Sequence, residues 1–174
     1  MEQGIGADVL LPKSVAPHVL DTNGLDVGPI LAQAAMDADL PLVLLLTVAK
    51  AESNFDPNAF RNGVWPDVSC GGFQQSVAYG LADNIGNGSN TPANIALCRQ
   101  ELADWTVATN VATRNLKPRY LSAQFAQFSG DDLILATCSS YNSGSVQPFG
   151  NWWWQSPQFH NYRAALTWAQ GVLE

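Results

Sequence analysis

The chain has 174 residues, of which 47% are hydrophobic and 13% are charged. That composition is typical of one folded domain with a substantial core, and it excludes an intrinsically disordered chain. The formal net charge of −7 argues against nucleic acid as a partner, because phosphate binding needs clustered Lys and Arg side chains. The longest apolar stretch, residues 40–49, is about half the length that a membrane-spanning helix needs, so no transmembrane segment is expected.

The N-terminal stretch lacks the pattern of a secretory signal peptide. Glu2 and Asp8 occur where such a peptide is basic, and no long apolar segment follows them. Residues 1–27 mix Gly, Pro and Asp with short apolar pieces, and we interpret them as an irregular leader. The folded domain is therefore expected to span residues 28–174.

Two helices are predicted directly after the leader. Pro29 and Pro41 are typical of first helical positions, and they predict helices over residues 29–38 and 41–52. The second segment is rich in Leu and Val without interruption, so we expect it to be a fully buried central helix. Residues 53–73 contain several turn pairs with Gly or Pro and are predicted to form a loop.

The remainder of the chain is also predicted to be helical. Capping residues followed by Pro, or by an acidic residue three positions later, mark several helix starts. The helices are predicted over residues 74–82, 91–116, 118–128, 133–141 and 157–172. Because there is no internal repeat and no low-complexity linker, the sequence predicts a single, mostly α-helical domain.

The cysteines and histidines do not form a metal-binding pattern. Cys70, Cys98 and Cys138 are odd in number and widely spaced, which fits neither a disulfide framework nor a CxxC site. We interpret them as three buried thiols, with one disulfide plus one free thiol as the alternative. His18 and His160 lie far apart and in no ligand motif, so no metal is expected.

Three short stretches combine polar side chains with turn residues: AESNFDPNAF (51–60), GGFQQS (71–76) and SSYNSGSV (139–146). In the first, Glu52 ends the apolar helix, where an ionised carboxylate is costly to bury unless it is paired or kept neutral. A carboxylic acid whose pKa an apolar pocket raises to about 6 can protonate a leaving oxygen near neutral pH. Glu52 is therefore a candidate general acid; taken alone, it would also fit a helix-terminal carboxylate in water.

The order and spacing of these stretches resemble the lytic transglycosylase branch of the lysozyme superfamily. That family has Glu-Ser-x-Phe-x-Pro-x-Ala, then Gly-Leu-Met-Gln, then Ala-Tyr-Asn-x-Gly. The matching residues here are Glu52, Ser53, Phe55, Pro57, Ala59, Gly72, Gln75, Tyr141, Asn142 and Gly144. The residues that depart from the pattern are Phe73 and Gln74, in place of Leu and Met, and Ser140, in place of Ala. The resemblance covers about residues 42–146, and GGFQQS is also similar to resuscitation-promoting-factor domains.

The resemblance implies an α+β, lysozyme-like catalytic domain over residues 28–174, with a cleft for peptidoglycan glycan strands and no cofactor. It implies cleavage of the β-1,4 bond between MurNAc and GlcNAc, with Glu52 as the general acid and then the general base. The 6-hydroxyl of the substrate would attack the anomeric carbon and leave a 1,6-anhydro-MurNAc end. The substrate contacts that we expect on this basis are Ser53, Phe73, Gln75, Tyr141 and Asn142.

Further candidates come from the residues themselves. Trp65 and the run Trp152–Trp154 offer flat faces for sugar rings, an interpretation from composition alone. Asp56 or Asp67 could supply the second carboxylate of a hydrolytic muramidase, since hydrolysing glycosidases usually use two. Asn142 also fits an ordinary helix C-cap.

Two other classes of function are also compatible with the sequence. One is a non-catalytic glycan-binding module, and the other is a structural domain of a larger particle. Because no signal peptide is recognised, we expect a phage endolysin or virion-associated lysin module. Such a module would act from the host cytoplasm on the cell wall after release, or would belong to the virion.

Overall fold

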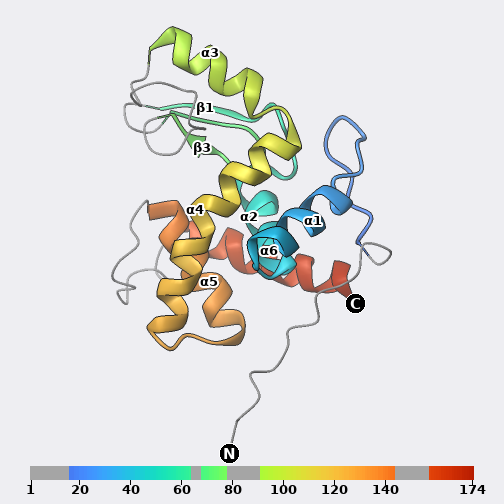
Figure 1. Ribbon diagram of the computed structural model, residues 1–174, viewed down its shortest axis with the longest axis vertical. Helices are drawn as coiled ribbons and strands as arrows, with labels where there is room; N and C mark the ends of the chain where they lie inside the picture. The colour runs from blue at the N-terminus through green and yellow to red at the C-terminus, as the bar shows by residue number, and fades with distance from the viewer. Residues whose placement is uncertain (1–15, 64–67, 78–90, 144–156) are drawn as a thin grey trace, which may run out of the picture.

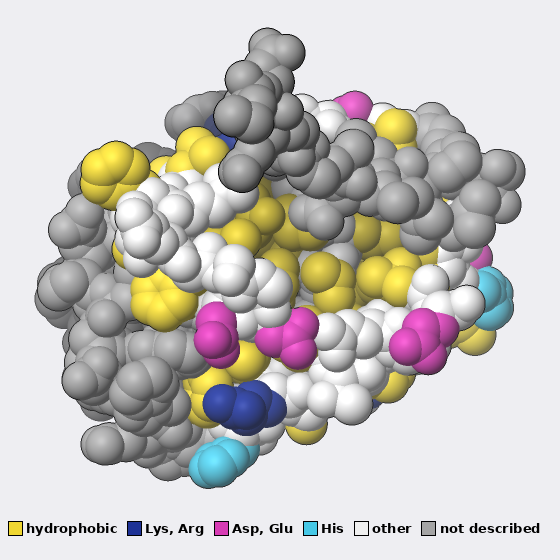
Figure 2. All heavy atoms as spheres, turned by 90° about the horizontal axis from the view of Figure 1, so that it is seen from below, with side chains coloured by type: hydrophobic (Ala, Val, Ile, Leu, Met, Phe, Trp, Pro, Cys, Tyr) yellow, Lys and Arg dark blue, Asp and Glu magenta, His cyan; other side chains and the backbone are white. Residues whose placement is uncertain are grey.

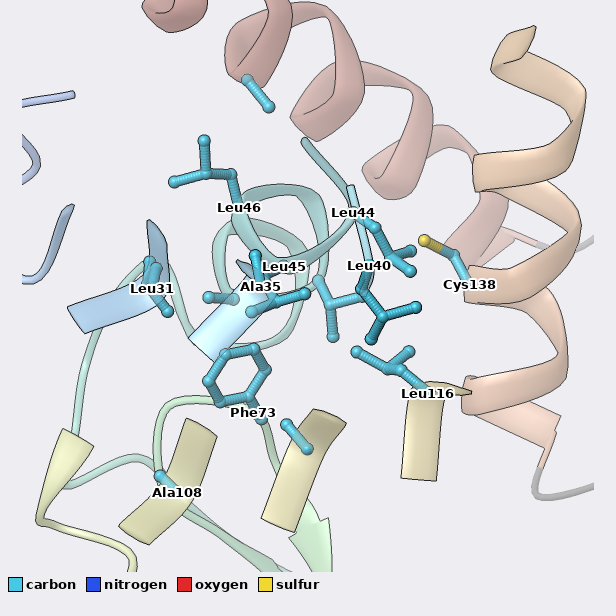
Figure 3. Close-up of a cluster of buried hydrophobic side chains, with 14 of the residues drawn as sticks. Leu31, Ala35, Leu40, Leu44, Leu45, Leu46, Phe73, Ala108, Leu116 and Cys138 are labelled. Atoms are coloured by element: carbon cyan, nitrogen blue, oxygen red, sulfur yellow. The ribbon is translucent and has the colours of Figure 1, made fainter. Parts of the chain in front are cut away.

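Helix α2 (Leu42–Ser53) lies at the centre of the computed structural model, which describes residues 16–63, 68–77, 91–143 and 157–174. Its residues from Leu44 to Ala49 are all buried, which confirms the prediction of a buried central helix. A helix that is apolar all round must be covered all round. Figure 3 shows the leucines of α2 pointing toward side chains of several surrounding elements, among them Leu31, Phe73 and Leu116.

Five further helices surround α2 in the described residues, and together they give a mostly helical single domain (Figure 1). Helices α1 (Gly28–Ala38), α5 (Gly130–Ser143) and α6 (Pro157–Leu173) pack directly against α2. Helix α4 (Trp105–Phe125) packs against α1 and α5, and it runs from the sheet to the opposite end of the molecule. Helix α3 (Pro92–Glu101) lies at the sheet end.

A small antiparallel sheet occupies part of the segment that the sequence predicted as loop and short helix. Its strands are β1 (Phe60–Asn62), β2 (Val68–Cys70) and β3 (Gln75–Ser76), in the order β1-β2-β3. The stretch 53–73 is rich in loops as predicted, but it also contains β1 and β2, which were not predicted. The start of the helix predicted over 74–82 is wrong, because β3 lies there; residues 78–82 lie outside the described ranges. Strands of two or three residues are too short to show an alternating apolar pattern.

Two helix boundaries in the middle of the chain also differ from the prediction. The helix predicted over 91–116 is broken between α3 and α4, where the Asp104 carboxylate accepts hydrogen bonds from the N–H groups of Thr106 and Val107. Pro118 does not start a new helix but lies inside α4, which tolerates the missing N–H because buried residues on both sides of Pro118 hold the helix in place. The helices predicted over 29–38, 133–141 and 157–172 are confirmed.

Residues 16–27 contain little regular structure but are attached to the helical core. Val19 and Val27 are buried, and Leu20 and Asp26 form an isolated β-bridge. The Asp21 carboxylate closes the turn between them by accepting hydrogen bonds from two backbone N–H groups of that turn. No helix among the described residues is long and apolar enough to cross a membrane.

Candidate active site

Glu52 lies in the last turn of α2, which ends because Asn54 adopts a left-handed conformation with φ of 54°. Burial raises the pKa of the Glu52 carboxyl above its ordinary value of 4.5. Three neighbours act in the opposite direction: the Tyr162 hydroxyl, the positive charge of Arg61 and the side-chain amide of Asn142. The net direction is upward, which is the direction that a general acid working near neutral pH needs.

The surroundings of Glu52 come from helices that are distant in sequence. Tyr162 of α6 donates a hydrogen bond from its hydroxyl to Glu52 Oε1. Tyr141 and Cys138 of α5 lie beside the same carboxyl, since burial first and the charge of Glu52 second raise the pKa of both groups. The carboxyl group therefore lies among two phenols and a thiol that all stay neutral at ordinary pH.

Tyr162 is the neighbour of Glu52 that the sequence analysis missed. It belongs to a buried stripe of α6 with helical spacing, formed by Phe159, Tyr162, Leu166 and Ala169. Such a stripe is typical of core packing, and nothing local distinguishes Tyr162 from its apolar neighbours. The one signal in the sequence is the hydroxyl itself, because a buried Tyr usually needs a hydrogen-bond partner.

The three sequence stretches meet at one place through two hydrogen bonds to the turn at residues 71–74. Ser53 Oγ donates to the carbonyl oxygen of Gly72 at 2.7 Å, and the Tyr141 hydroxyl donates to that of Phe73 at 2.8 Å. In this structure both hydroxyls therefore bind protein backbone rather than standing free for substrate. Ser53 and Tyr141 fix the turn against the end of α2 and the end of α5.

The two glycines of this turn have separate roles. Gly71 has φ of 77°, a left-handed conformation that favours Gly. Gly72 lies against the ring of Trp105, and a Cβ added at Gly72 would clash with Trp105 Cη2. A Cβ at Gly71 would also lie 2.7 Å from the Leu102 carbonyl oxygen, so the pair in GGFQQS is explained by one backbone angle and by close contacts at both positions.

Phe73 and Gln75 were expected to contact substrate, but both side chains are buried. The Phe73 ring is fully buried and lies edge-on to Trp105, with 5.9 Å between ring centroids, so it belongs to the core and not to a sugar-binding surface (Figure 3). Gln75 is 3% exposed, and its Oε1 accepts a hydrogen bond from Asn115 Nδ2 at 3.0 Å. Its Nε2 has no partner among the described residues, which leaves one buried donor for a further ligand.

The remaining candidates divide into those that the structure describes and those outside it. Asn142 is exposed, contacts Glu52 and lies within the last turn of α5 rather than capping it. Asp56 organises the turn after α2, where its carboxylate accepts hydrogen bonds from Thr22 Oγ1 and the Asn58 N–H. The candidates outside the described residues are Trp65, Asp67 and Trp152–Trp154.

The described residues offer no arrangement for a bound metal ion. No group of three or more His, Cys, Asp or Glu side chains in these ranges could hold one. The three cysteines are free and buried, as predicted.

An apolar hollow of about 350 Å³ lies away from Glu52. It is lined by the end of α1, the start of α2 and parts of α4 and α5, including Met36, Leu42, Tyr120 and Ile134. Figure 2 shows hydrophobic side chains gathered in a hollowed face of the molecule, with acidic side chains along its margin. None of the predicted site residues that the structure describes lines this hollow.

No protein-family model matches the chain, and no curated protein or solved structure is significantly similar to it. The function is therefore inferred from the residues that meet around Glu52. These are Ser53 and the turn at 71–74 on one side, and Tyr141, Asn142 and Tyr162 on the other.

Proposed function

We propose that the chain is a peptidoglycan-degrading enzyme that cleaves the β-1,4 bond between MurNAc and GlcNAc. The observation that carries this proposal is the raised pKa of the Glu52 carboxyl, which burial causes. This carboxyl lies where the three sequence stretches meet. A neutral carboxylic acid can protonate the glycosidic oxygen as an oxocarbenium-like state develops.

We propose the lytic transglycosylase outcome rather than hydrolysis. The three stretches resemble those of lytic transglycosylases, which rely on one Glu, and Asp67, a candidate second carboxylate, lies outside the described residues. After donating its proton, Glu52 is a carboxylate and can accept the proton of the MurNAc 6-hydroxyl as that oxygen attacks the anomeric carbon. The products are a free 4-hydroxyl on the leaving GlcNAc and a 1,6-anhydro-MurNAc end, and Glu52 is protonated again.

Product analysis tests this proposal directly. Purified peptidoglycan is digested with the wild-type protein, Glu52→Gln and Glu174→Gln, and the soluble products are identified by mass spectrometry. We expect anhydro-muropeptides from the wild type and from Glu174→Gln, whose exposed carboxyl is at the end of the chain, and none from Glu52→Gln. Reducing-end products would indicate a hydrolase and direct attention to Asp67. Glycan binding without products from any variant would indicate a binding module, and neither binding nor products would indicate a structural domain.

Tyr162→Phe is expected to move the pH dependence of cleavage. The Tyr162 hydroxyl lowers the pKa of Glu52, so removing that hydroxyl should raise it. Because the acid must be protonated to act, the decline of the rate at alkaline pH should shift to higher pH. The measurement is the rate against pH for the wild type, Tyr162→Phe and Tyr120→Phe, a matched change in the distant hollow. An unchanged profile in Tyr162→Phe would contradict Glu52 as the titrating acid.

A further inference from the structure

Two of the buried thiols are neighbours at the sheet end of the molecule. Cys70 ends β2 and Cys98 lies in α3, and both side chains are fully buried. Helix α3 packs against β2, and the two side chains are close enough to shift each other's pKa. Cys138 lies elsewhere, on α5 beside Glu52, and is not part of this pair.

The placement of the two thiols is fixed by the way α3 lies on the sheet. Cys98 is the buried residue of α3, so it carries the packing of that helix against the strands. The next residue, Arg99, places its guanidinium 4.8 Å from the centroid of the Phe60 ring. Phe60 is the cross-strand partner of Cys70. Two successive residues of α3 therefore contact one cross-strand pair, which holds the sulfur atoms in place.

The two thiols are chemically unequal. The neighbouring Cys98 thiol lowers the pKa of Cys70, and the positive charge of Arg99 acts in the same direction. The Cys70 thiol, together with burial, raises the pKa of Cys98. The positive charge of Arg99, which lies over the cross-strand partner of Cys70, favours Cys70 as the attacking thiol.

We propose that Cys70 and Cys98 form a dithiol–disulfide pair, which a small-molecule disulfide such as oxidised glutathione closes into a bond between β2 and α3. The Cys70 thiolate attacks one sulfur of the oxidant and releases one thiol. Cys98 then gives up its proton and attacks the Cys70 sulfur, which releases the second thiol. Two protein thiols and one external disulfide thus yield one protein disulfide and two external thiols.

Access to the pair requires α3 to separate from the sheet. Cys70 and Cys98 belong to the hydrophobic core, and Ile95 and Leu97 of α3 pack against it, so an oxidant reaches the thiols when this part of the chain opens or refolds. Closing the bond would fix α3 on the strand that leads into the turn at residues 71–74. That turn accepts the hydrogen bonds of Ser53 and Tyr141, so the disulfide would brace one side of the site. The inference stands on these contacts and not on the proposed function.

Mass mapping tests the pair. The wild-type chain is unfolded in reductant and refolded in a buffer of reduced and oxidised glutathione, so that burial of the thiols does not limit the reaction. Free thiols are then alkylated and the peptides are mapped without reduction. We expect a peptide pair joined through Cys70 and Cys98, with Cys138 alkylated. No joined pair, or joining through Cys138 as often as between the other two, would overturn the proposal.

Thermal unfolding provides the second measurement. The oxidised wild type should melt about 5–10 °C above the reduced protein, because the bond closes a long loop of chain, and reductant should abolish the difference. Cys138→Ala should keep this response to oxidation, and Cys98→Ala should lose it. A response of the same size in Cys98→Ala would contradict the assignment. If a variant fails to fold, the mass mapping of the wild type still shows whether Cys70 and Cys98 are joined.

Discussion

Replacing Glu52 by Gln should lower the rate of glycan cleavage by about 10²- to 10⁴-fold, the range typical for loss of a general acid–base group. Gln has nearly the shape of Glu and can still accept the hydrogen bond from Tyr162, but it cannot donate a proton to the glycosidic oxygen. The loss should therefore appear in kcat rather than in substrate binding. Glu174→Gln, the same chemical change at an exposed position, should leave the rate unchanged.

The same substitution should stabilise the fold at neutral pH, which is unusual for a mutation near the core. Folding raises the pKa of Glu52 above its ordinary value of 4.5, so the native state holds this proton more tightly than the unfolded chain does. Below that ordinary value both states are protonated and the carboxyl carries no ionisation penalty. Between that ordinary value and the raised native pKa the unfolded chain loses this proton while the native state keeps it, so the wild type loses stability across this interval, whereas the amide side chain of the Glu52→Gln variant stays neutral.

Melting temperatures measured against pH distinguish an effect of Glu52 ionisation from a structural role of its carboxyl group. Glu52→Gln should match the wild type at pH values below 4.5, should melt increasingly higher as the pH rises above 4.5, and should keep a constant advantage above the native pKa of Glu52. Glu174→Gln should show no such divergence. If Glu52→Gln were instead destabilised equally at all pH values, the carboxyl would have a structural role, and its assignment as the acid would lose its main support.

The helical framework was predictable where the sequence pattern was strong and local. Helix α2 follows from an unbroken apolar run, and α6 follows from a cap followed by Pro. The break before α4 contains neither Gly nor Pro, and it depends on the Asp104 side chain capping two N–H groups. Pro118 gave the opposite error: a new helix was predicted to start there, whereas tertiary packing keeps α4 continuous across it.

The candidate site was predictable as a set of stretches but not as a set of contacts. Glu52 could be singled out because a carboxyl group ends a buried helix. Ser53 was expected to contact substrate and Tyr141 to contact the acid or the sugar, whereas both hydroxyls bind the backbone of the 71–74 turn and Tyr141 also lies beside Glu52. Tyr162 lies 110 residues from Glu52, and only the packing of α6 on α2 brings the two together. Contacts of this kind depend on the whole fold and leave no local pattern.

Trp105 contacts the turn at Gly72, the ring of Phe55 and the carboxylate of Asp21. Of the substitutions considered, its removal should destabilise the fold most. The ring is 3% exposed and lies between the turn at Gly72 and the ring of Phe55, whose centroid is 6.2 Å away. Its Nε1 donates a hydrogen bond to Asp21 Oδ2 at 2.9 Å, which ties residues 16–27 to α4. Trp105→Ala should therefore lower the free energy of unfolding by about 3–5 kcal/mol.

Two further variants separate the packing of Trp105 from its hydrogen bond. Trp105→Phe keeps an aromatic ring but leaves the buried Asp21 carboxylate without this donor, so it should lose about 1–3 kcal/mol. Phe125→Ala removes an aromatic ring that is 90% exposed at the end of α4 and should change stability by about 0.5 kcal/mol or less. Denaturant unfolding of the three variants measures these differences. If Trp105→Ala cost no more than Phe125→Ala, the ring would not support the turn, and the close approach at Gly72 would need another explanation.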